Sequence, residues 1–379
     1  MSKRHKIVCW VLFLALLAGF CLLGSCGPAE QEDPALQQDP EEAGQSEELG
    51  GTGRVFTDVA GREVTIPAEV NKVYSTSPVG TMLVYTINPD KLAGWNAELR
   101  AGELRFIAEK YHQLPVMGGW FGKTAEGNVE EIMKENPDVI ISVGDIDSSS
   151  AETADQIQEQ TNIPVALLNL DLDKIDQTYI ALGELMNEKE VAGDLALYCR
   201  ETVADILDKA AQISAGQRIK VYYAEGPQGL NTDPAGSRHV QVLDMVGGLN
   251  VAEIEMPGKA GQADVSLEQV LHWDPDLIIC WHHEQDGYYE GILSDPDWQG
   301  ISAVKNNKVY EIPCAPFSWF DRPPSVNRVL GLKWLGNLLY PGIYDYDLMQ
   351  ETKEFYDLFY HYELSDEEAA ELLKNALPH

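Results

Sequence analysis

An internal repeat constrains the fold of this chain more than any other feature of its sequence. Residues 128–142 read NVEEIMKENPDVIIS, and residues 266–280, which lie 138 positions later, read SLEQVLHWDPDLIIC. In each copy a capping residue precedes two helical turns, a proline ends the helix, and three apolar residues predict a short buried strand. A solenoid would need a shorter period, so this repeat predicts two similar α/β lobes.

The same order of strands and helices surrounds both copies of the repeat. Strands that alternate with helices predict parallel sheets, and therefore two Rossmann-like lobes of the α/β class. The predicted elements are a hairpin at residues 54–67, strands at 72–75, 165–169, 219–224 and 309–313, and helices at 79–86 and 240–246.

A helical segment separates the two lobes. Residues 172–213 are helical in pattern, and residues 188–213 contain one glycine and no proline. A helix of that length spans on the order of 40 Å, so we expect a stiff linker with a ligand cleft between the lobes. The terminal residues 344–379 predict one or two helices that pack on the outside.

The first 25 residues predict a sorting signal rather than a part of the fold. Lys3, Arg4 and Lys6 precede an almost wholly apolar run that contains no acid. The run is nearly long enough to span a membrane, so a permanent anchor is the alternative. The motif LGSC at residues 23–26 favours a lipoprotein signal, because it resembles a bacterial lipobox in which Cys26 receives lipid. We expect a protein that is anchored to a membrane without spanning it.

An acidic segment follows Cys26. Residues 27–53 contain eight acids and many Gln, Pro, Gly and Ala residues, so they predict a disordered tether without a core. The predicted division of the chain is a signal peptide at 1–25, a tether at 26–53, an N-terminal lobe at 54–171, a helical linker at 172–215, a C-terminal lobe at 216–342 and a helical extension at 343–379.

Charge and cysteine content exclude several classes of function. Without the three bases of the signal, 24 bases face 61 acids, a net charge of −37. That balance argues against binding to nucleic acid or to anionic lipid. Cys199, Cys280 and Cys314 remain after the signal and Cys26, without the spacing of a zinc site. Cys280 and Cys314 each end a predicted strand and could form a disulfide, but buried free thiols are favoured.

Aromatic and cationic side chains follow the predicted strands. Ligands bind outside the carboxyl ends of the strands in open α/β sheets. Aromatic faces suit a flat ligand, and arginines suit carboxylates or an anionic chelate. A binding site of this kind needs no nucleophile. The candidate ligand-binding residues are Ser77, Trp95, Trp120, Arg238, Trp281, Trp319, Phe320 and Arg322.

His282 and His283 form a second candidate site, for a metal ion. Imidazole suits iron, nickel or zinc, although adjacent side chains on a strand point apart and converge only on a loop. The alternative is a polar loop at the mouth of the cleft. The sequence contains no HExxH, GxSxG or P-loop, and no GxGxxG after a strand, which argues against a lipid-anchored metalloenzyme that uses these two histidines.

The order of these motifs resembles a known family, the substrate-binding proteins of ABC importers for iron-siderophores, haem and cobalamin. The resemblance rests on the lipobox, TDVAGREVTIP, KVYSTSP, both repeat copies and WFDRPPSVNR, and it covers about residues 54–341. It implies two lobes joined by one rigid helix, without a tightly bound cofactor or catalytic residues. A structural surface protein is the remaining alternative.

The resemblance also implies a function and partners. We expect an extracytoplasmic, lipid-anchored monomer that binds an iron(III) chelate, such as an iron-siderophore, in the cleft and delivers it to an ABC permease dimer with its ATPase. Haem, cobalamin or a nickel chelate would fit the same residues, and the anchoring membrane is left open. Glu130 and Glu268 hold the second helical position in the two repeat copies. In the family, acids at this place dock into arginine pockets of the permease; locally, they also complement the helix dipole.

Overall fold

The computed structural model describes residues 53–121, 127–258 and 261–378. The predicted signal peptide, Cys26 and all but the last residue of the predicted tether lie outside the described residues. Residues 51–379 form one compact unit. It begins with the expected hairpin, in which β1 (Arg54–Thr57) pairs antiparallel with β2 (Glu63–Ile66). Gly61 adopts a φ of 80° in the turn, a conformation that glycine permits without strain.

The N-terminal lobe contains a parallel sheet in the order β3-β4-β5. Side chains of β4 alternate between two hydrophobic clusters: Val139 and Ile141 belong to one, and Ile140 belongs to the other. Both faces of the sheet are therefore covered, as parallel sheets require. The elements are β3 (Val73–Ser75), β4 (Val139–Gly144), β5 (Val165–Asn169), α1 (Pro78–Ile87), α2 (Ala101–Phe106), α3 (Val129–Glu135) and α4 (Ser150–Thr161), with 3-10 helices η1 (Pro89–Lys91) and η2 (Glu109–Tyr111).

The C-terminal lobe contains a second parallel sheet, in the order β11-β10-β6-β8. Its strands are β6 (Lys220–Ala224), β8 (Leu249–Asn250), β10 (Leu277–Cys280) and β11 (Val309–Glu311), while β7 (Asn231–Thr232) pairs with β9 (Ala263–Asp264). The helices are α7 (Gln241–Met245), α8 (Leu267–Trp273), α9 (Tyr289–Ser294) and α10 (Ser302–Lys305), with η5 (Arg238–Val240), η6 (His283–Gln285) and η7 (Pro296–Trp298). The predicted α/β class with two parallel sheets is confirmed.

The repeat copies adopt the same local structure. The side chain of Asn128 accepts a hydrogen bond from the backbone of Glu131 at the start of α3, and Ser266 does the same for Gln269 at the start of α8. Each helix ends at a left-handed residue, Asn136 in α3 and its counterpart in α8, directly before the proline. A buried strand follows in both cases, so local capping and apolar patterning determine this unit twice.

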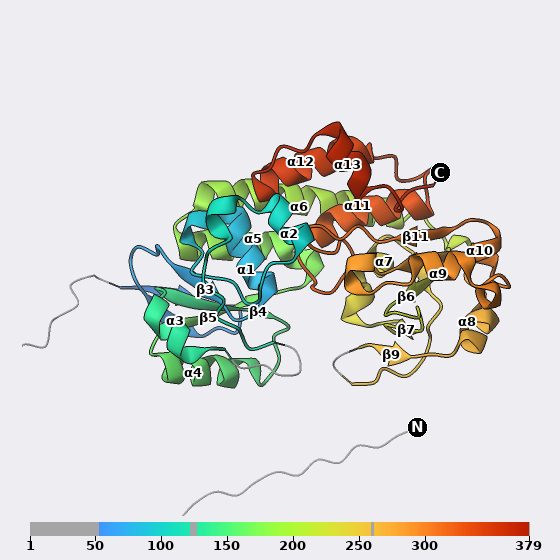
Figure 1. Cartoon of the computed structure of the whole chain (residues 1–379). Coiled ribbons are helices and arrows are strands. Elements are labelled where there is room, and N and C mark those ends of the chain that lie inside the picture. The colour runs from blue at the N-terminus through green and yellow to red at the C-terminus, as the bar shows by residue number, and fades with distance from the viewer. Residues whose placement is uncertain (1–52, 122–126, 259–260, 379) are drawn as a thin grey trace, which may run out of the picture. The chain divides into compact units, whose positions relative to one another are not determined.

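The linker consists of two helices rather than one continuous helical segment. After η3 (Leu172–Lys174), α5 (Ile175–Met186) ends at Asn187, which adopts a φ of 61°. The long helix α6 (Lys189–Ala210) has 22 residues, about 33 Å at 1.5 Å per residue, and is followed by η4 (Ala215–Gln217). It is shorter than predicted but still joins the two lobes (Figure 1).

The C-terminal extension, residues 343–379, contains two helices at the outer edge of the compact unit, as predicted, and the first of them buries one face deeply. These helices are α12 (Leu348–Tyr360) and α13 (Asp366–Leu372), and they follow α11 (Asn327–Leu339). Helix α11 packs against α6, α12 packs against α11 and α1, and α13 packs against α12 (Figure 1). Phe355, Tyr356 and Phe359 of α12 are fully buried in the largest hydrophobic cluster, which also includes residues of α1 and α6. The extension therefore packs against elements of the N-terminal lobe and the linker. The domain boundaries drawn from the sequence stay predictions.

Cys199, Cys280 and Cys314 are free and buried. The Cys280 thiol donates to the carbonyl of Tyr310 at 3.3 Å. Burial raises the pKa of Cys314 to about 12, so this thiol stays protonated and unreactive near neutral pH. The preference for free thiols over a disulfide is confirmed.

We expect the two lobes to move little on ligand binding. The linker helix α6 has no glycine-rich hinge. In addition, Arg105 of α2 pairs with Glu371 of α13 at 2.8 Å, which connects the N-terminal lobe to the C-terminal extension. Closure should therefore amount to a few degrees. Small-angle scattering with and without ligand tests this, and a large change in the radius of gyration would contradict it.

Candidate functional site

Loops at the carboxyl ends of the parallel strands form a cavity between the two lobes. Two residues separate β3 from helix α1, and Phe317 and Pro323 belong to the loop after β11. A cavity of about 310 Å³ opens between α1, residues 95–100, Phe121, Phe317 and Pro323. Most of its lining side chains are apolar, among them Met82 and Leu99. We refer to it as the interlobe cavity.

A cluster of charges surrounds Arg322, the residue before Pro323 of the interlobe cavity. The Nε atom of Arg322 donates to Glu225 at 2.9 Å, and its Nη2 atom donates to Asp233 at 2.5 Å. Asp321 lies 3.6 Å from the Nε atom. All three carboxylates are buried, and we call this group the Arg322 cluster. The positive charge of Arg322 is therefore already compensated by carboxylates of the C-terminal lobe.

Two acids of the Arg322 cluster and the neighbouring His239 have the composition of a metal site. Ligand atoms of Asp233, His239 and Asp321 lie within 4.8 Å of one another, and His239 Nδ1 lies 2.6 Å from Asp321 Oδ2. The other Asp321 oxygen, Oδ1, is buried and has no hydrogen-bond partner among the described residues. Asp233 and Asp321 also lie beside the guanidinium of Arg322, so a cation bound here would share both carboxylates with that group.

Burial and charge shift the pKa values of this cluster in opposite directions. Burial, reinforced by the charge of Asp233, raises the pKa of Glu225 to about 8. Burial alone would lower the pKa of Arg322. The carboxylates of Glu225, Asp233 and Asp321 outweigh this effect and raise the pKa of the guanidinium. Glu225 therefore takes up a proton on folding near neutral pH.

This proton uptake predicts a pH-dependent effect of Glu225→Gln. The folded pKa of Glu225, about 8, lies above its ordinary value of 4.5, so ionisation of this group destabilises the native protein as pH rises from 4.5 to 8. Glutamine cannot ionise but still accepts from Arg322. The free energy of unfolding of the variant, relative to the parent, should rise by more than about 1 kcal/mol between pH 5 and pH 9.

Denaturant titrations at pH 5, 7 and 9 measure this difference. Glu253→Gln, which changes an exposed acid of the same lobe, is the matched control and should show no such trend. A constant difference between Glu225→Gln and the parent across this range would contradict the raised pKa.

Two other arginines connect the lobes. Arg238 of η5 forms an ion pair with Asp145, which follows β4 in the N-terminal lobe. Arg328 of α11 is buried and donates to the carbonyl of Leu170, which follows β5, at 3.0 Å. Burial lowers the pKa of Arg328 to about 10. Arg238 thus lies where the sequence predicted a cleft residue, but its charge is already paired across the cleft.

The predicted tryptophans differ in exposure. Trp95 lines the interlobe cavity, although only 3% of it is exposed, and its indole N–H donates to the Tyr111 carbonyl at 2.8 Å. Trp281 is partly buried and donates to the hydroxyl of Tyr223 at 2.6 Å. Trp120 is partly buried against the cluster on the other face of the N-terminal sheet. Of the three, Trp95 contributes directly to the cavity wall.

Trp319 and Phe320 are core residues, and the expectation that they present a face to the ligand needs correction. Their exposed fractions are 0% and 1%, and both belong to the largest hydrophobic cluster. The Phe320 ring packs 4.6 Å from the ring of Tyr223. The loop folds back onto the lobe, so these rings stabilise the loop while Phe317 and Pro323 reach the cavity.

Ser77 offers a polar group at the start of α1. It is 9% exposed, and its hydroxyl is buried without a hydrogen-bond partner in the described parts of the chain. A buried hydroxyl of this kind gains free energy when a ligand group bonds to it. Pro78, the next residue, lines the interlobe cavity.

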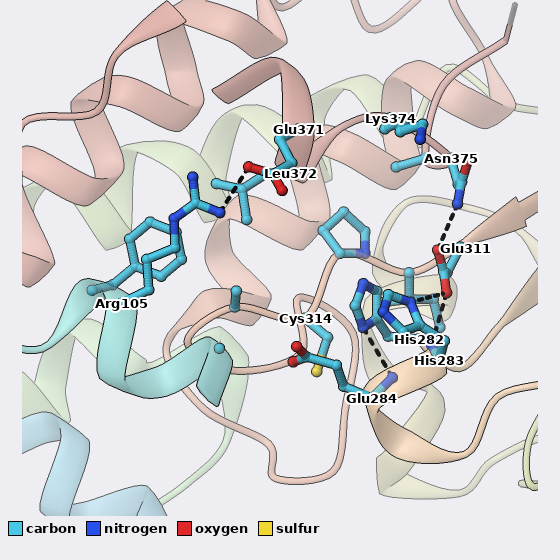
Figure 2. A pocket seen from close by; sticks show the side chains of 16 residues that line it. Arg105, His282, His283, Glu284, Glu311, Cys314, Glu371, Leu372, Lys374 and Asn375 are labelled. Carbon is cyan, nitrogen blue, oxygen red and sulfur yellow. Dashed lines mark hydrogen bonds and ion pairs between the residues drawn. The ribbon is translucent and has the colours of Figure 1, made fainter. Parts of the chain in front are cut away.

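His282 and His283 lie at a different cavity, of about 310 Å³, which Figure 2 shows. The backbone N–H of His283 donates to Glu311 at 2.7 Å, and the Nδ1 atom of its ring lies 3.1 Å from the same carboxylate oxygen. Burial lowers the pKa of His282. Burial alone would raise the pKa of Glu311. Hydrogen bonds from Asn375 and His283, together with the charge of His282, outweigh this effect and lower the pKa of Glu311. Glu311 was not among the predicted residues.

The two acids predicted to dock into a permease occupy equivalent positions. Glu130 is the second residue of α3 and Glu268 is the second residue of α8, and both are exposed. Hydrogen bonds from its own backbone N–H and from Ser266 lower the pKa of Glu268. The structure agrees with their placement, and their docking role stays a prediction.

No helix among the described residues has both the length and the apolar character needed to span a membrane. The lipid on Cys26 stays a prediction, because this residue lies outside the described part of the chain.

Comparisons with known proteins identify the family. The family profile described as "Periplasmic binding protein" matches residues 120–316. An ABC transporter solute binding protein from Sulfurospirillum deleyianum has a solved structure that superposes with a TM-score of 0.79 at 32% identity, over 85% of this chain and 99% of that one. The relatives that match are transport proteins rather than enzymes.

Two curated relatives bind different ligands. The molybdate-binding protein MolA of Haemophilus influenzae is 26% identical over 349 residues, which cover 84% of this chain and 93% of MolA. The haem uptake protein IsdE of Staphylococcus aureus is 24% identical over 218 residues, which cover 56% of this chain and 70% of IsdE. Because the family profile matches more than half of its length, this chain belongs to the periplasmic binding protein family and is a solute-binding protein of an ABC importer.

Proposed function

We propose that this protein captures an organic complex of a metal ion in the interlobe cavity and delivers it to its ABC permease. The observation that carries the proposal is the mostly apolar wall of that cavity, which α1, residues 95–100 and Phe317 form together. Sites for organic ligands combine such walls with a few convergent polar groups. Asn96 and Arg100 are polar groups at the same cavity, and Arg100 pairs there with Glu103 at 2.6 Å.

The charges near the cavity favour a chelate over a bare oxyanion. An oxyanion in a desolvated site needs donors whose charge is not already compensated. Arg322 pairs with Glu225 and Asp233, and Arg238 pairs with Asp145. A chelate instead carries its metal inside an organic shell and can use the apolar walls.

Iron(III) chelates of the siderophore type are the first candidates for the ligand, and haem, cobalamin and nickel chelates belong to the same class. The relationship to the haem uptake protein IsdE supports an organic metal complex. We propose that Ser77 and Trp95 contact the ligand, with Trp120, Trp281 and Arg238 at the edge of the cleft and Arg322 holding the loop that carries Pro323. The lipid on Cys26 would hold the protein on the extracytoplasmic face of a membrane beside the permease and its ATPase.

Molybdate is the second candidate, because MolA is matched over 93% of its length. Binding of this oxyanion would require Arg322 to exchange at least one carboxylate partner for the ligand. Where the exchanged partner is Asp233, the exchange would leave a buried carboxylate without its guanidinium, at a cost of several kcal/mol.

Native mass spectrometry of the chain after incubation with each candidate tests the proposal. The panel contains an iron(III) siderophore chelate, haem, cobalamin, a nickel chelate and molybdate. We expect one organic chelate to remain bound at one per chain and molybdate to be lost. Retention of molybdate alone would overturn the proposal in favour of the second candidate.

A variant of the cavity wall tests the site itself. Leu99→Asp places a charge on the apolar wall of the interlobe cavity and should weaken chelate binding by about 1.5–3 kcal/mol, which is more than tenfold. Leu104→Asp, which changes an exposed leucine of α2 outside this cavity, is the matched control. Equal affinities of both variants, measured by isothermal titration calorimetry, would show that the ligand binds elsewhere.

A further inference from the structure

Three groups that can bind a metal ion converge at the second cavity, which we call the histidine cavity. Ligand atoms of His282, His283 and Glu311 all lie within 4.8 Å of one another. We propose that these three residues bind a divalent transition-metal ion at a site separate from the interlobe cavity. His282 and His283 lie in the loop and in η6 directly after β10, and Glu311 is the last residue of β11. The register of these neighbouring strands pairs Cys280 with Glu311.

The spacing of these groups suits a metal ion. Ligands at about 2.0–2.2 Å from a metal lie roughly 3.0–3.6 Å from one another. His283 Nδ1 lies 3.1 Å from Glu311 Oε1, so an ion to one side of this pair can bind both atoms when the imidazole nitrogen carries no proton. The His282 ring centre is 4.0 Å from that of His283, and its Nδ1 atom accepts a 3.3 Å hydrogen bond from the backbone N–H of Glu284.

A supporting hydrogen-bond network holds the carboxylate of Glu311 in place. The side chain of Asn375 donates to Glu311 Oε2 at 2.8 Å, and the backbone N–H of Glu311 donates to the carbonyl of Asn375 at 2.9 Å. Metal-binding sites rely on such partners to orient the ligand side chains. Because Asn375 belongs to the C-terminal extension, a metal ion on Glu311 would also stabilise the contact of that extension with β11.

The histidine cavity has room and access for an ion. Its volume is about 310 Å³, and the side chain of His283 is 72% exposed, so an ion can enter from solvent. Figure 2 shows Glu284 and Cys314 beside the two imidazoles, and Arg105 and Glu371 across the cavity. The residues that line this cavity and those that line the interlobe cavity do not overlap. Water or Glu284 can complete the coordination.

The ligand set selects a class of metal. Two imidazole nitrogens and one carboxylate oxygen suit zinc, nickel, cobalt or iron(II), whereas magnesium and calcium prefer oxygen ligands alone. The proposed site is a resident site that this chain builds, distinct from the metal complex carried as cargo.

Calorimetric titration of the tag-free chain with zinc chloride and with cobalt chloride, after removal of metal with EDTA, tests the site. We expect one ion per chain. His283→Ala changes an exposed side chain and should fold normally, yet weaken binding more than 100-fold. Glu311→Gln should act similarly, and Asn375→Ala should weaken binding about tenfold. His272→Ala, on the exposed face of α8, is the matched control and should bind like the parent.

The cobalt-loaded chain gives a second readout, because visible absorption of cobalt(II) changes with nitrogen and oxygen coordination. This spectrum should be absent from His283→Ala and unchanged in His272→Ala. Equal zinc and cobalt binding by the parent and His283→Ala would overturn the site. Loss of chelate binding in His283→Ala, measured by native mass spectrometry, would overturn its separation from the cargo cavity.

Discussion

Reversing both helix-start acids, Glu130→Lys with Glu268→Lys, should reduce transport to background while leaving ligand affinity almost unchanged. Both side chains are exposed at the second position of helices α3 and α8, one in each lobe, and neither lines the interlobe cavity. Two acids related by the symmetry of the repeat match the two-fold arrangement of a permease dimer. Uptake of labelled chelate by cells or vesicles at matched protein level measures the effect.

The matched control reverses two other acids in first helical turns. Glu152→Lys with Glu290→Lys changes one exposed residue in each lobe, at the starts of α4 and α9. This pair has the same effect on net charge and on local helix dipoles, so it should leave uptake near the parent level. Full uptake by the Glu130→Lys, Glu268→Lys variant would limit the two acids to a local role at the helix starts.

Removing the guanidinium of the Arg322 cluster, with Arg322→Ala, should lower the free energy of unfolding by about 3–5 kcal/mol at pH 8. The substitution leaves Glu225, Asp233 and Asp321 buried next to one another without the cation that bonds to the first two. The loss should be smaller at pH 5, because Glu225, whose pKa is already raised to about 8, is then protonated.

Arg322→Lys is the conservative comparison for this experiment. Lysine keeps the charge but cannot bond to two carboxylates with a planar fork, so we expect an intermediate loss. Denaturant titrations of the parent and both variants at pH 5 and 8 measure the effect. A loss below about 1 kcal/mol for Arg322→Ala at pH 8 would show that the cluster contributes little to stability.

Those parts of the fold that depend on local signals could be predicted from the sequence. The strand at residues 165–169 has the same bounds in the structure, and helix α1 differs by one residue at each end from the prediction. Apolar runs, capping residues and prolines act over a few positions, so the repeat units with Asn128 and Ser266 were predictable.

Features that depend on contacts distant in sequence were not predictable. The break at Asn187 between α5 and α6 is supported by a hydrogen bond from the Val70 backbone to its side chain, 117 positions away. Burial of α12 could have been inferred from the helical spacing of Phe355, Tyr356, Phe359 and Tyr360, but its partners on α1 and α6 could not.

In the candidate site, too, features set by local sequence were predictable and features set by distant contacts were not. Positions after strand ends indicated the correct loops, and Trp95 and Pro78 do line the interlobe cavity. The sequence could not show that Trp319 turns inward, nor that Arg322 finds Glu225 and Asp233, 97 and 89 positions away. No local pattern encodes such pairs, because tertiary folding brings them together.

Methyl NMR of methionine-labelled protein tests most directly whether an organic metal chelate binds in the interlobe cavity. Iron(III) is paramagnetic and broadens nearby signals, and the same chelate with gallium(III) is the diamagnetic control. Met82 lines the cavity, whereas Met133 on α3 and Met349 on α12 do not. With the iron(III) chelate bound, the Met82 methyl signal should broaden most strongly. An unchanged Met82 signal, with broadening at Met133 or Met349 instead, would contradict the proposed site.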